Sequence, residues 1–326
     1  MSFKVRVGAI ERPKSPIADR QRVQQTWGIS GTDTLEKLRV ATPGLTYISV
    51  ASPEFFDKVA QAQGSSSDQL VAVARVSSDA SDLLQRVEIL PRGSNRLLLG
   101  FDPRPPRGWP IEEPAEPGKN LLTEIFVREA SELQNLGAFG GGDLVVVETE
   151  DQGSVLVSDR PYGHIKLAAL RGSRLFVTQE QPLRIGRVGL VAGSGGRLSL
   201  STPELVVKNR IRAATADRWS DSRVIVQTSK LSTPSLRVAV AGSGAVRFVS
   251  NSDERESSCD SQSLAIAGSG TIDTGDLLSQ STRVAIFGSG TATLQASESL
   301  AVGSLGSARV NYLEPELRRD LEIFGR

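Results

Sequence analysis

Three copies of one short pattern decide the fold of this chain: VAVAGSG at 238–244, LAIAGSG at 264–270 and VAIFGSG at 284–290. A looser copy, GLVAGSG, lies at 189–195, and LAVGS follows at 300–304. Repetition at a period of roughly 20 to 50 residues is typical of proteins that stack one small structural unit on the next. The repeat therefore predicts a stacked fold to which each copy contributes one coil.

Around the glycines, apolar and polar residues alternate with the same phase from copy to copy. The aliphatic positions two and four residues before the first glycine are Val191, Val238, Val240, Leu264, Ile266, Val284 and Ile286. Because successive side chains of a strand point to opposite faces, each copy predicts strand, tight corner and strand, with one face buried. In the copy at 189–195, Leu198 and Leu200 fall one residue out of phase, which calls for a bulge or a different corner.

Glycine is expected at the corners because stacked backbones leave no room for a Cβ and because glycine adopts positive φ without strain. The predicted corner glycines are Gly193, Gly195, Gly242, Gly244, Gly268, Gly270, Gly288 and Gly290, with a further corner at Gly303 and with 224–232 as a coil that lost its corner. Coils of about 15 to 26 residues are typical of a parallel β-helix, whereas antiparallel hairpins would need Asn-Gly or Asp-Gly turns. We therefore expect an all-β solenoid of parallel strands.

Composition shifts divide the chain into five segments. Six prolines between 102 and 120 cannot donate to a sheet ladder, which predicts a loop there. Near the end, Leu313, Leu317 and Leu321 recur at helical spacing. The expected segments are an irregular N-terminal segment (1–40), an N-terminal β segment (41–101), a proline-rich loop (102–120), the β-solenoid (121–312) and a short helical cap (313–326). Within the second, Ser52 and Pro53 predict the start of a helix over 52–63.

The overall composition excludes several classes of protein. Of the 326 residues, 39% are apolar and 5% aromatic, which predicts a thin aliphatic core. The net charge of +1 gives no overall electrostatic footprint for nucleic acid or for an anionic membrane. No apolar run reaches the length of a membrane span, and MSFKVRVGAI at 1–10 lacks the apolar stretch of a secretory signal, so the chain as given is expected in the cytoplasm by default.

The sequence contains few residues suited to catalysis or to metal binding. His164 is the only histidine and Cys259 the only cysteine, which argues against a Ser-His-Asp triad, a zinc site or an intrachain disulfide. The Gly-Ser-Gly corners lack the lysine of a phosphate loop. We expect no metal and no cofactor, and we interpret Cys259 as a bystander in a polar loop.

Outward residues of the coils are the candidate binding residues. Arg237, Arg247, Arg283 and Asp273 alternate with buried positions and so face solvent, where they would contact a carbohydrate or protein surface. The alternative is a carbohydrate-active enzyme, a polysaccharide lyase or glycosidase, because such enzymes use paired carboxylates along a groove. Its candidate carboxylates are Asp273 with Asp276, and Asp253 with Glu254 and Asp260.

Three features together resemble the family called putative auto-transporter adhesin, head GIN domain, a domain of unknown function. They are LTEIFVREASELQNLGAFGGGDLVVVE at 122–148, the AxAGSG corners, and the upstream strands LVAVARV and LLLGF. The resemblance covers roughly 45–310 and implies a right-handed β-helix-like solenoid, an adhesin-like and non-enzymatic interaction module, and a place in the cell envelope or outside the cell. It transfers no catalytic residues. The chain departs from the family in its start, without a signal or lipoprotein cysteine, and in the insertion at 102–120.

Overall fold

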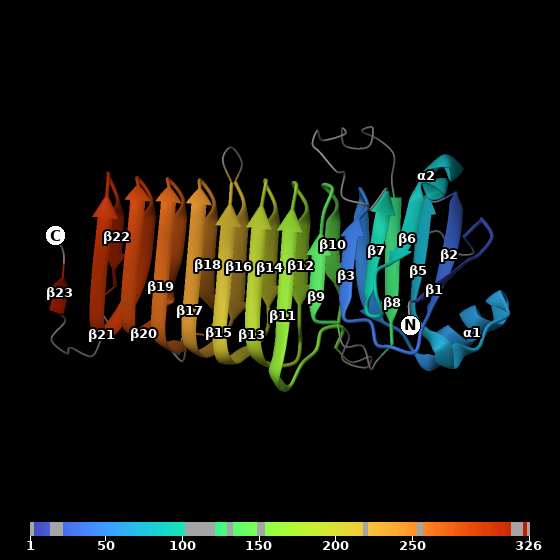
Figure 1. Ribbon diagram of the computed structural model, residues 1–326, viewed down its shortest axis with the longest axis horizontal. Helices are drawn as coiled ribbons and strands as arrows, with labels where there is room; N and C mark the ends of the chain where they lie inside the picture. The colour runs from blue at the N-terminus through green and yellow to red at the C-terminus, as the bar shows by residue number, and fades with distance from the viewer. Residues whose placement is uncertain are drawn as a thin grey trace. The chain divides into compact units, whose positions relative to one another are not determined.

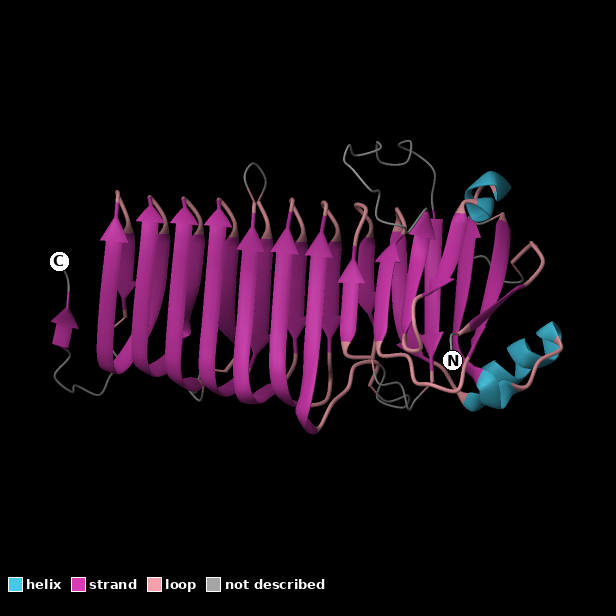
Figure 2. Ribbon diagram, in the orientation of Figure 1, coloured by secondary structure: helices cyan, strands magenta, loops and turns pink. Residues whose placement is uncertain are grey.

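The computed structural model describes residues 3–13, 22–101, 121–128, 133–148, 154–217, 221–252, 257–313 and 322–324. The predicted proline-rich loop at 102–120 lies outside these residues. The chain divides into two compact units: unit 1 is Met1–Val157 with Ser173–Phe176, and unit 2 is Ser158–Gly172 with Val177–Arg326. The described secondary structure is predominantly β, as the sequence predicts (Figure 2).

Unit 1 combines antiparallel and parallel strands with two α-helices. Its elements are β1 (Lys4–Val7), β2 (Val23–Ser30), β3 (Lys37–Ala41), β4 (Leu45–Val50), α1 (Pro53–Gln63), the 3-10 helix η1 (Ser67–Gln69), β5 (Leu70–Ser78), α2 (Ser81–Gln85), β6 (Val87–Pro91), β7 (Arg96–Phe101), β8 (Leu121–Val127), β9 (Asn135–Ala138) and β10 (Asp143–Val146). Strands β1, β2, β5 and β8 pair antiparallel in that order, and β8, β4 and β10 continue in parallel. The helix predicted at 52–63 is confirmed as α1.

The N-terminal segment is not irregular, so the prediction for 1–40 is wrong where β1, β2 and the start of β3 lie. Strand β2 reads VQQTWGIS, whose weak alternation gives little strand signal. It nevertheless bonds to β1 on one side and to β5 on the other, and it buries Trp27 and Ile29. Tertiary pairing thus decides the conformation of a segment whose own sequence does not.

Unit 2 stacks parallel strands in two layers (Figure 1). The long layer contains β11 (Arg160–Leu170), β13 (Leu183–Gly193), β15 (Glu204–Ala216), β17 (Lys230–Gly242), β19 (Ser258–Gly268) and the later parts of β20 (Thr271–Gly288) and β21 (Thr291–Leu305). The short layer contains β14 (Arg197–Ser201), β16 (Arg223–Thr228), β18 (Ala245–Ser250), the first residues of β20 and β21, and β22 (Arg309–Tyr312). Strand β12 (Arg174–Thr178) is divided between the two units.

The register in the long layer follows the repeat. Val240 pairs with Ile266, and Ile266 pairs with Ile286. All three are buried, as the alternation predicts, and they line an interior filled by aliphatic side chains. One strand position in each coil therefore forms a continuous row through the core, which is the packing unit of a stacked sheet.

The Gly-Ser-Gly tripeptides connect the two layers. Gly242 ends β17, and Ser243 and Gly244 connect it to β18; the next two copies lie in the same place one and two coils on. A Cβ at Gly268, where φ is 128°, would lie 2.5 Å from the carbonyl oxygen of Gly242. That oxygen accepts a hydrogen bond from Ser269 N at 3.0 Å. The backbone of one coil thus occupies the space that a side chain of the next would need.

Two copies of the pattern differ from the expected corner. In the copy at 189–195 the corner lies one residue later than predicted, because Gly193 aligns through Ala216 with Ala241 and Ser194, with a φ of 51°, takes the corner position. Val191 consequently faces outward and is 42% exposed, so its prediction as a buried position is wrong, whereas Leu198 and Leu200 are buried. The corner predicted at Gly303 is wrong, because Gly303 pairs with Ala285 inside β21. Gly306 takes the corner position instead, since a Cβ there would lie 2.5 Å from the carbonyl oxygen of Gly288.

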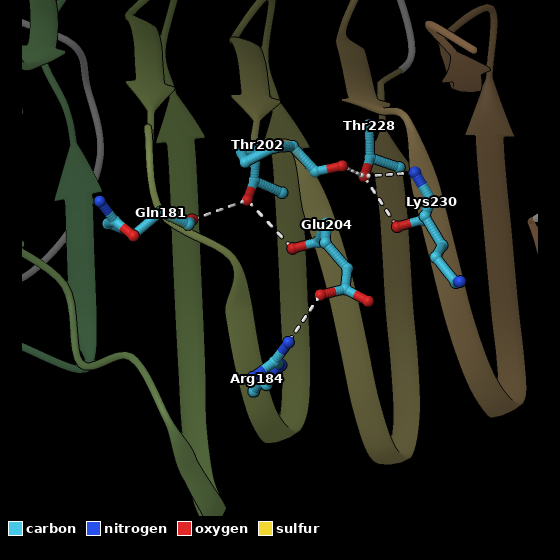
Figure 3. Close-up of polar contacts among 7 residues, drawn as sticks. Gln181, Arg184, Thr202, Glu204, Thr228 and Lys230 are labelled. Atoms are coloured by element: carbon cyan, nitrogen blue, oxygen red, sulfur yellow. Dashed lines mark hydrogen bonds and ion pairs between the residues drawn. The ribbon is translucent and has the colours of Figure 1, made fainter.

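Threonine hydroxyls form hydrogen bonds in the turns that lead from the short layer back to the long layer, away from the glycine corners (Figure 3). The hydroxyl of Thr202 donates toward the carbonyl oxygens of Gln181 at 3.2 Å and Glu204 at 3.1 Å. In the next coil, Thr228 donates toward Pro203 at 3.2 Å and Lys230 at 2.9 Å. Each hydroxyl lies within hydrogen-bond distance of a carbonyl in its own turn and of one in the preceding turn, so its single proton can bond to either and link neighbouring coils away from the glycines.

The helical cap predicted at 313–326 falls mostly outside the described residues. Glu322–Phe324 form strand β23, which pairs in parallel with Ser299–Ala301 of β21, so the helix prediction is wrong for these three residues. The long-layer part of β21 pairs with β20 on one side, and its other edge offers backbone hydrogen-bonding groups to β23. Pairing with such an edge favours a strand over a helix.

The stacked corners predict a specific loss of stability. We expect Gly268→Ala to lower the free energy of unfolding by about 2 to 4 kcal/mol, because its Cβ would overlap the Gly242 carbonyl at a positive φ. Gly189→Ala is the matched control, since its Cβ would find its nearest neighbour at an ordinary 3.6 Å. Denaturant unfolding followed by circular dichroism measures both, and equal stability of the two variants would contradict the argument.

Candidate functional site

Basic side chains gather on the outward face of the long layer of unit 2. The register places Arg237 beside Arg212 on one neighbouring strand and beside Ser263 on the other, and Ser263 beside Arg283. Lys166 and Gly189 continue this row toward β11. Arg187 and Arg210 form a second row two residues earlier. We call these six residues the basic strip: Lys166, Arg187, Arg210, Arg212, Arg237 and Arg283.

The acidic residues that the structure describes do not neutralise the charge of the basic strip. No salt bridge joins its members to an acidic residue within the described part of the chain. The guanidinium of Arg212 is the main cause that lowers the pKa of Arg210, and partial desolvation, Arg187 and Arg237 lower it further. Crowding of like charges at an exposed surface creates a local positive potential, which attracts anions.

A shallow groove of about 330 Å³ lies at one end of the basic strip. Ser235, Ser261, Ser281 and Ser299 pair in register across four strands and form a serine row along it. The groove is lined by this row together with Arg237, Gln262, Ser263, Thr282, Arg283 and Ala301. It therefore offers hydroxyl groups and two guanidinium groups to the same ligand.

On its other side, the basic strip borders a band of apolar residues. Ala239, Ala265 and Ala285 form one row, and Ala241, Ala267, Phe287 and Leu305 form the next. Phe287 and Leu305 are each 65% exposed. We call these seven residues the apolar band. Contiguous exposed apolar surface beside polar groups is typical of a binding site.

The structure divides the four predicted binding residues into two pairs, one in each layer. Arg237 and Arg283 line the same groove. Arg247 and Asp273 lie in the short layer, where Arg247 Nε is 3.2 Å from Asp273 Oδ2. That layer has its own recess of about 370 Å³, but its two arginines, Arg223 and Arg247, are paired with Asp221 and Asp273.

Sequence reasoning missed four members of the basic strip: Lys166, Arg187, Arg210 and Arg212. The available signal was position: Arg237 and Arg283 both lie five residues before a corner glycine. Arg212 holds the same place before Asp217, which takes the corner position in the coil that lacks a glycine. Without a glycine to mark that corner, the alignment could not be made from the sequence.

Of the five candidate catalytic carboxylates, Asp273 and Asp276 accept backbone hydrogen bonds, and Asp260 is exposed in β19. Asp273 Oδ1 accepts a hydrogen bond from Gly275 N, and Asp276 Oδ2 accepts one from Ser250 N, both at 3.1 Å. Asp253 and Glu254 lie outside the described residues. Among the residues that the structure describes, no three His, Cys, Asp or Glu side chains could together hold a metal ion, and no helix is long and apolar enough to cross a membrane.

Cys259 lies in a strand rather than in a polar loop, so that prediction is wrong. It sits in β19 with its side chain buried, because it occupies an inward position of the alternation. Burial, with a smaller contribution from Asp260, raises the pKa of the thiol to about 12. A thiol in this environment is a poor nucleophile.

Comparison with known proteins finds one matching family and several structures of similar fold. The sequence model of the family described as "Putative auto-transporter adhesin, head GIN domain" matches residues 123–314. No curated protein sequence matches. A crystal structure of a putative adhesin from Parabacteroides merdae is similar with a TM-score of 0.54 and 12% identity, covering 89% of this chain and 96% of that one. At this identity the likeness indicates the fold alone.

Two structures from Parabacteroides distasonis match with lower TM-scores. A putative adhesin has a TM-score of 0.48 and 12% identity, covering 93% of this chain and 94% of that one. A putative lipid binding protein has a TM-score of 0.48 and 14% identity, covering 92% of both chains.

The buried thiol predicts slow chemical labelling. We expect a disulfide reagent at mildly alkaline pH to modify Cys259 in the native protein about a hundredfold or more slowly than in denaturant, because burial suppresses the thiolate. The raised pKa also makes the stability of the folded protein depend on pH. The stabilisation that the neutral thiol contributes is complete below pH 9.0, the ordinary pKa of a thiol, and is lost as the pH rises toward about 12. As Cys259 is the only cysteine, absorbance reports it alone, and equal labelling rates would refute its burial.

Proposed function

The chain belongs to the putative auto-transporter adhesin, head GIN domain family, and from this we propose that it is a non-catalytic, adhesin-like β-solenoid that binds a carbohydrate surface. The single observation that carries the proposal is the groove in the long layer, where Arg237 and Arg283 meet the serine row. Sugar hydroxyls both donate and accept hydrogen bonds, so they match serine hydroxyls and guanidinium donors.

The finer features of the solenoid belong to the same proposal. We propose that its coils wind in a right-handed sense, which agrees with the handedness of about 98% of connections between parallel strands in one sheet. The Gly-Ser-Gly corners would keep successive coils aligned, so that outward residues form straight rows. The hydrogen bonds from Thr271 N to Gly244 O at 2.9 Å and from Thr291 N to Gly270 O at 3.1 Å support this role.

A binding role accounts for the carboxylates better than a catalytic one. A glycosidase needs two free carboxyl groups, one to act as general acid and the other as general base or nucleophile. Asp273 is paired with Arg247, and Asp276 accepts a backbone hydrogen bond, so both are committed to local structure. The family's description as the head of an auto-transporter adhesin supports a location in the cell envelope or outside the cell.

Blocking the groove without changing its charge tests the proposal. We expect Ser281→Trp to reduce binding to every glycan recognised by the wild-type protein on an array by about tenfold or more, because the indole would fill a groove of this size. Thr271→Trp is the matched control, since it adds the same side chain to an exposed position of the same strand, in the short layer. Unchanged binding by Ser281→Trp would remove the groove from the site.

A further inference from the structure

The basic strip is a local concentration of charge in a chain that is balanced as a whole. The net charge of the sequence is +1, yet six cationic side chains line one face of β11, β13, β15, β17 and β20. Acidic residues of the long layer lie elsewhere: Glu204 pairs with Arg184, and the exposed Asp260 and Glu298 directly precede members of the serine row. The strip therefore presents positive charge to solvent along most of its length.

The strip runs across the strands, along the direction in which the coils stack. Parallel strands lie about 4.8 Å apart, so the strip extends over about 24 Å from β11 to β20. A single small anion would meet two or three of its cations. Only an elongated ligand that lies along the stacking direction would meet all of them, and the serine row continues the same line over β21.

The chemistry of the neighbouring rows selects among elongated anions. Arginine binds carboxylate and sulfate groups through paired N–H donors. Single-stranded nucleic acids are bound largely by aromatic platforms for the bases, and Phe287 is the only aromatic residue of the apolar band. Membrane surfaces are bound by large apolar side chains that insert between lipids, whereas five of the seven residues of the apolar band are alanines. A flat row of alanines fits the C–H face of a sugar ring instead.

We propose that this face binds a linear acidic polysaccharide, whose carboxylate or sulfate groups pair with the basic strip while its rings lie against the serine row and the apolar band. This inference rests on the proposed function and specifies its ligand class. It makes binding depend on charge and on the length of the polymer rather than on one particular sugar.

The test compares a neutral polymer with its charged derivative. Dextran, dextran sulfate and polygalacturonate are titrated against the full chain by biolayer interferometry. We expect the wild type to bind both polyanions, and the triple variant Arg212→Gln, Arg237→Gln, Arg283→Gln to bind them about tenfold more weakly, which is about 1.4 kcal/mol. The control Arg197→Gln, Arg223→Gln, Arg309→Gln removes the same charge from the short layer and should change affinity less than about twofold.

The salt dependence of binding, and binding to other anionic ligands, distinguish the acidic polysaccharide from the alternatives. Binding through the strip should weaken as salt rises, because exposed charges are screened. Glycan binding that is lost in Ser281→Trp but is insensitive to salt and to the arginine triple variant would overturn the acidic ligand and leave the proposed function standing. No binding to any glycan would overturn both. Tighter binding to single-stranded DNA or to phosphatidylserine vesicles than to dextran sulfate would overturn the polysaccharide as the ligand.

Discussion

The contact between successive backbones at the corners is the constraint on which the rest of unit 2 depends. A carbonyl of one coil lies where the Cβ of the next would be, as between Gly242 and Gly268 and again between Gly268 and Gly288. Between coils that both have a glycine at the corner, this contact favours one alignment, because a shift of one residue would place a side chain against that carbonyl. Equivalent aliphatic residues of successive coils, such as Val240 and Ile266, then pack against one another in the interior.

Alignment of the coils also creates the candidate site, because it makes residues that are far apart in the sequence neighbours on one surface of the sheet. Arg237 and Arg283 are two complete coils apart in the sequence, but in the sheet only Ser263 lies between them. The serine row arises in the same way from four separate coils. A binding face built like this needs no loop or cleft of its own, and its length grows with the number of coils.

The sequence predicts those features that a corner glycine or an alternation of apolar and polar residues indicates. Val240, Ile266 and Ile286 could be assigned to one buried row because each precedes a Gly-Ser-Gly by the same number of residues. Arg212 could not be aligned with Arg237, since Asp217 replaces the corner glycine of its coil. Nor could β2 be recognised, because its strand conformation comes from pairing with β1 and β5 rather than from its own residues. Corners without glycine and strands held by their neighbours leave little local signal.

The difference between the two faces of unit 2 argues that the basic strip is not a requirement of folding. On the short layer, Arg223 and Arg247 each lie beside a carboxylate, so this fold readily accommodates paired charges. On the long layer, Arg210 lies among other arginines that lower its pKa, an arrangement that works against the folded state. Substitution of one such arginine by a neutral residue would relieve the repulsion without disturbing the core, because the side chains point to solvent. Proteins keep destabilising surface arrangements of this kind where they serve a function, and an anionic ligand would supply the missing partners.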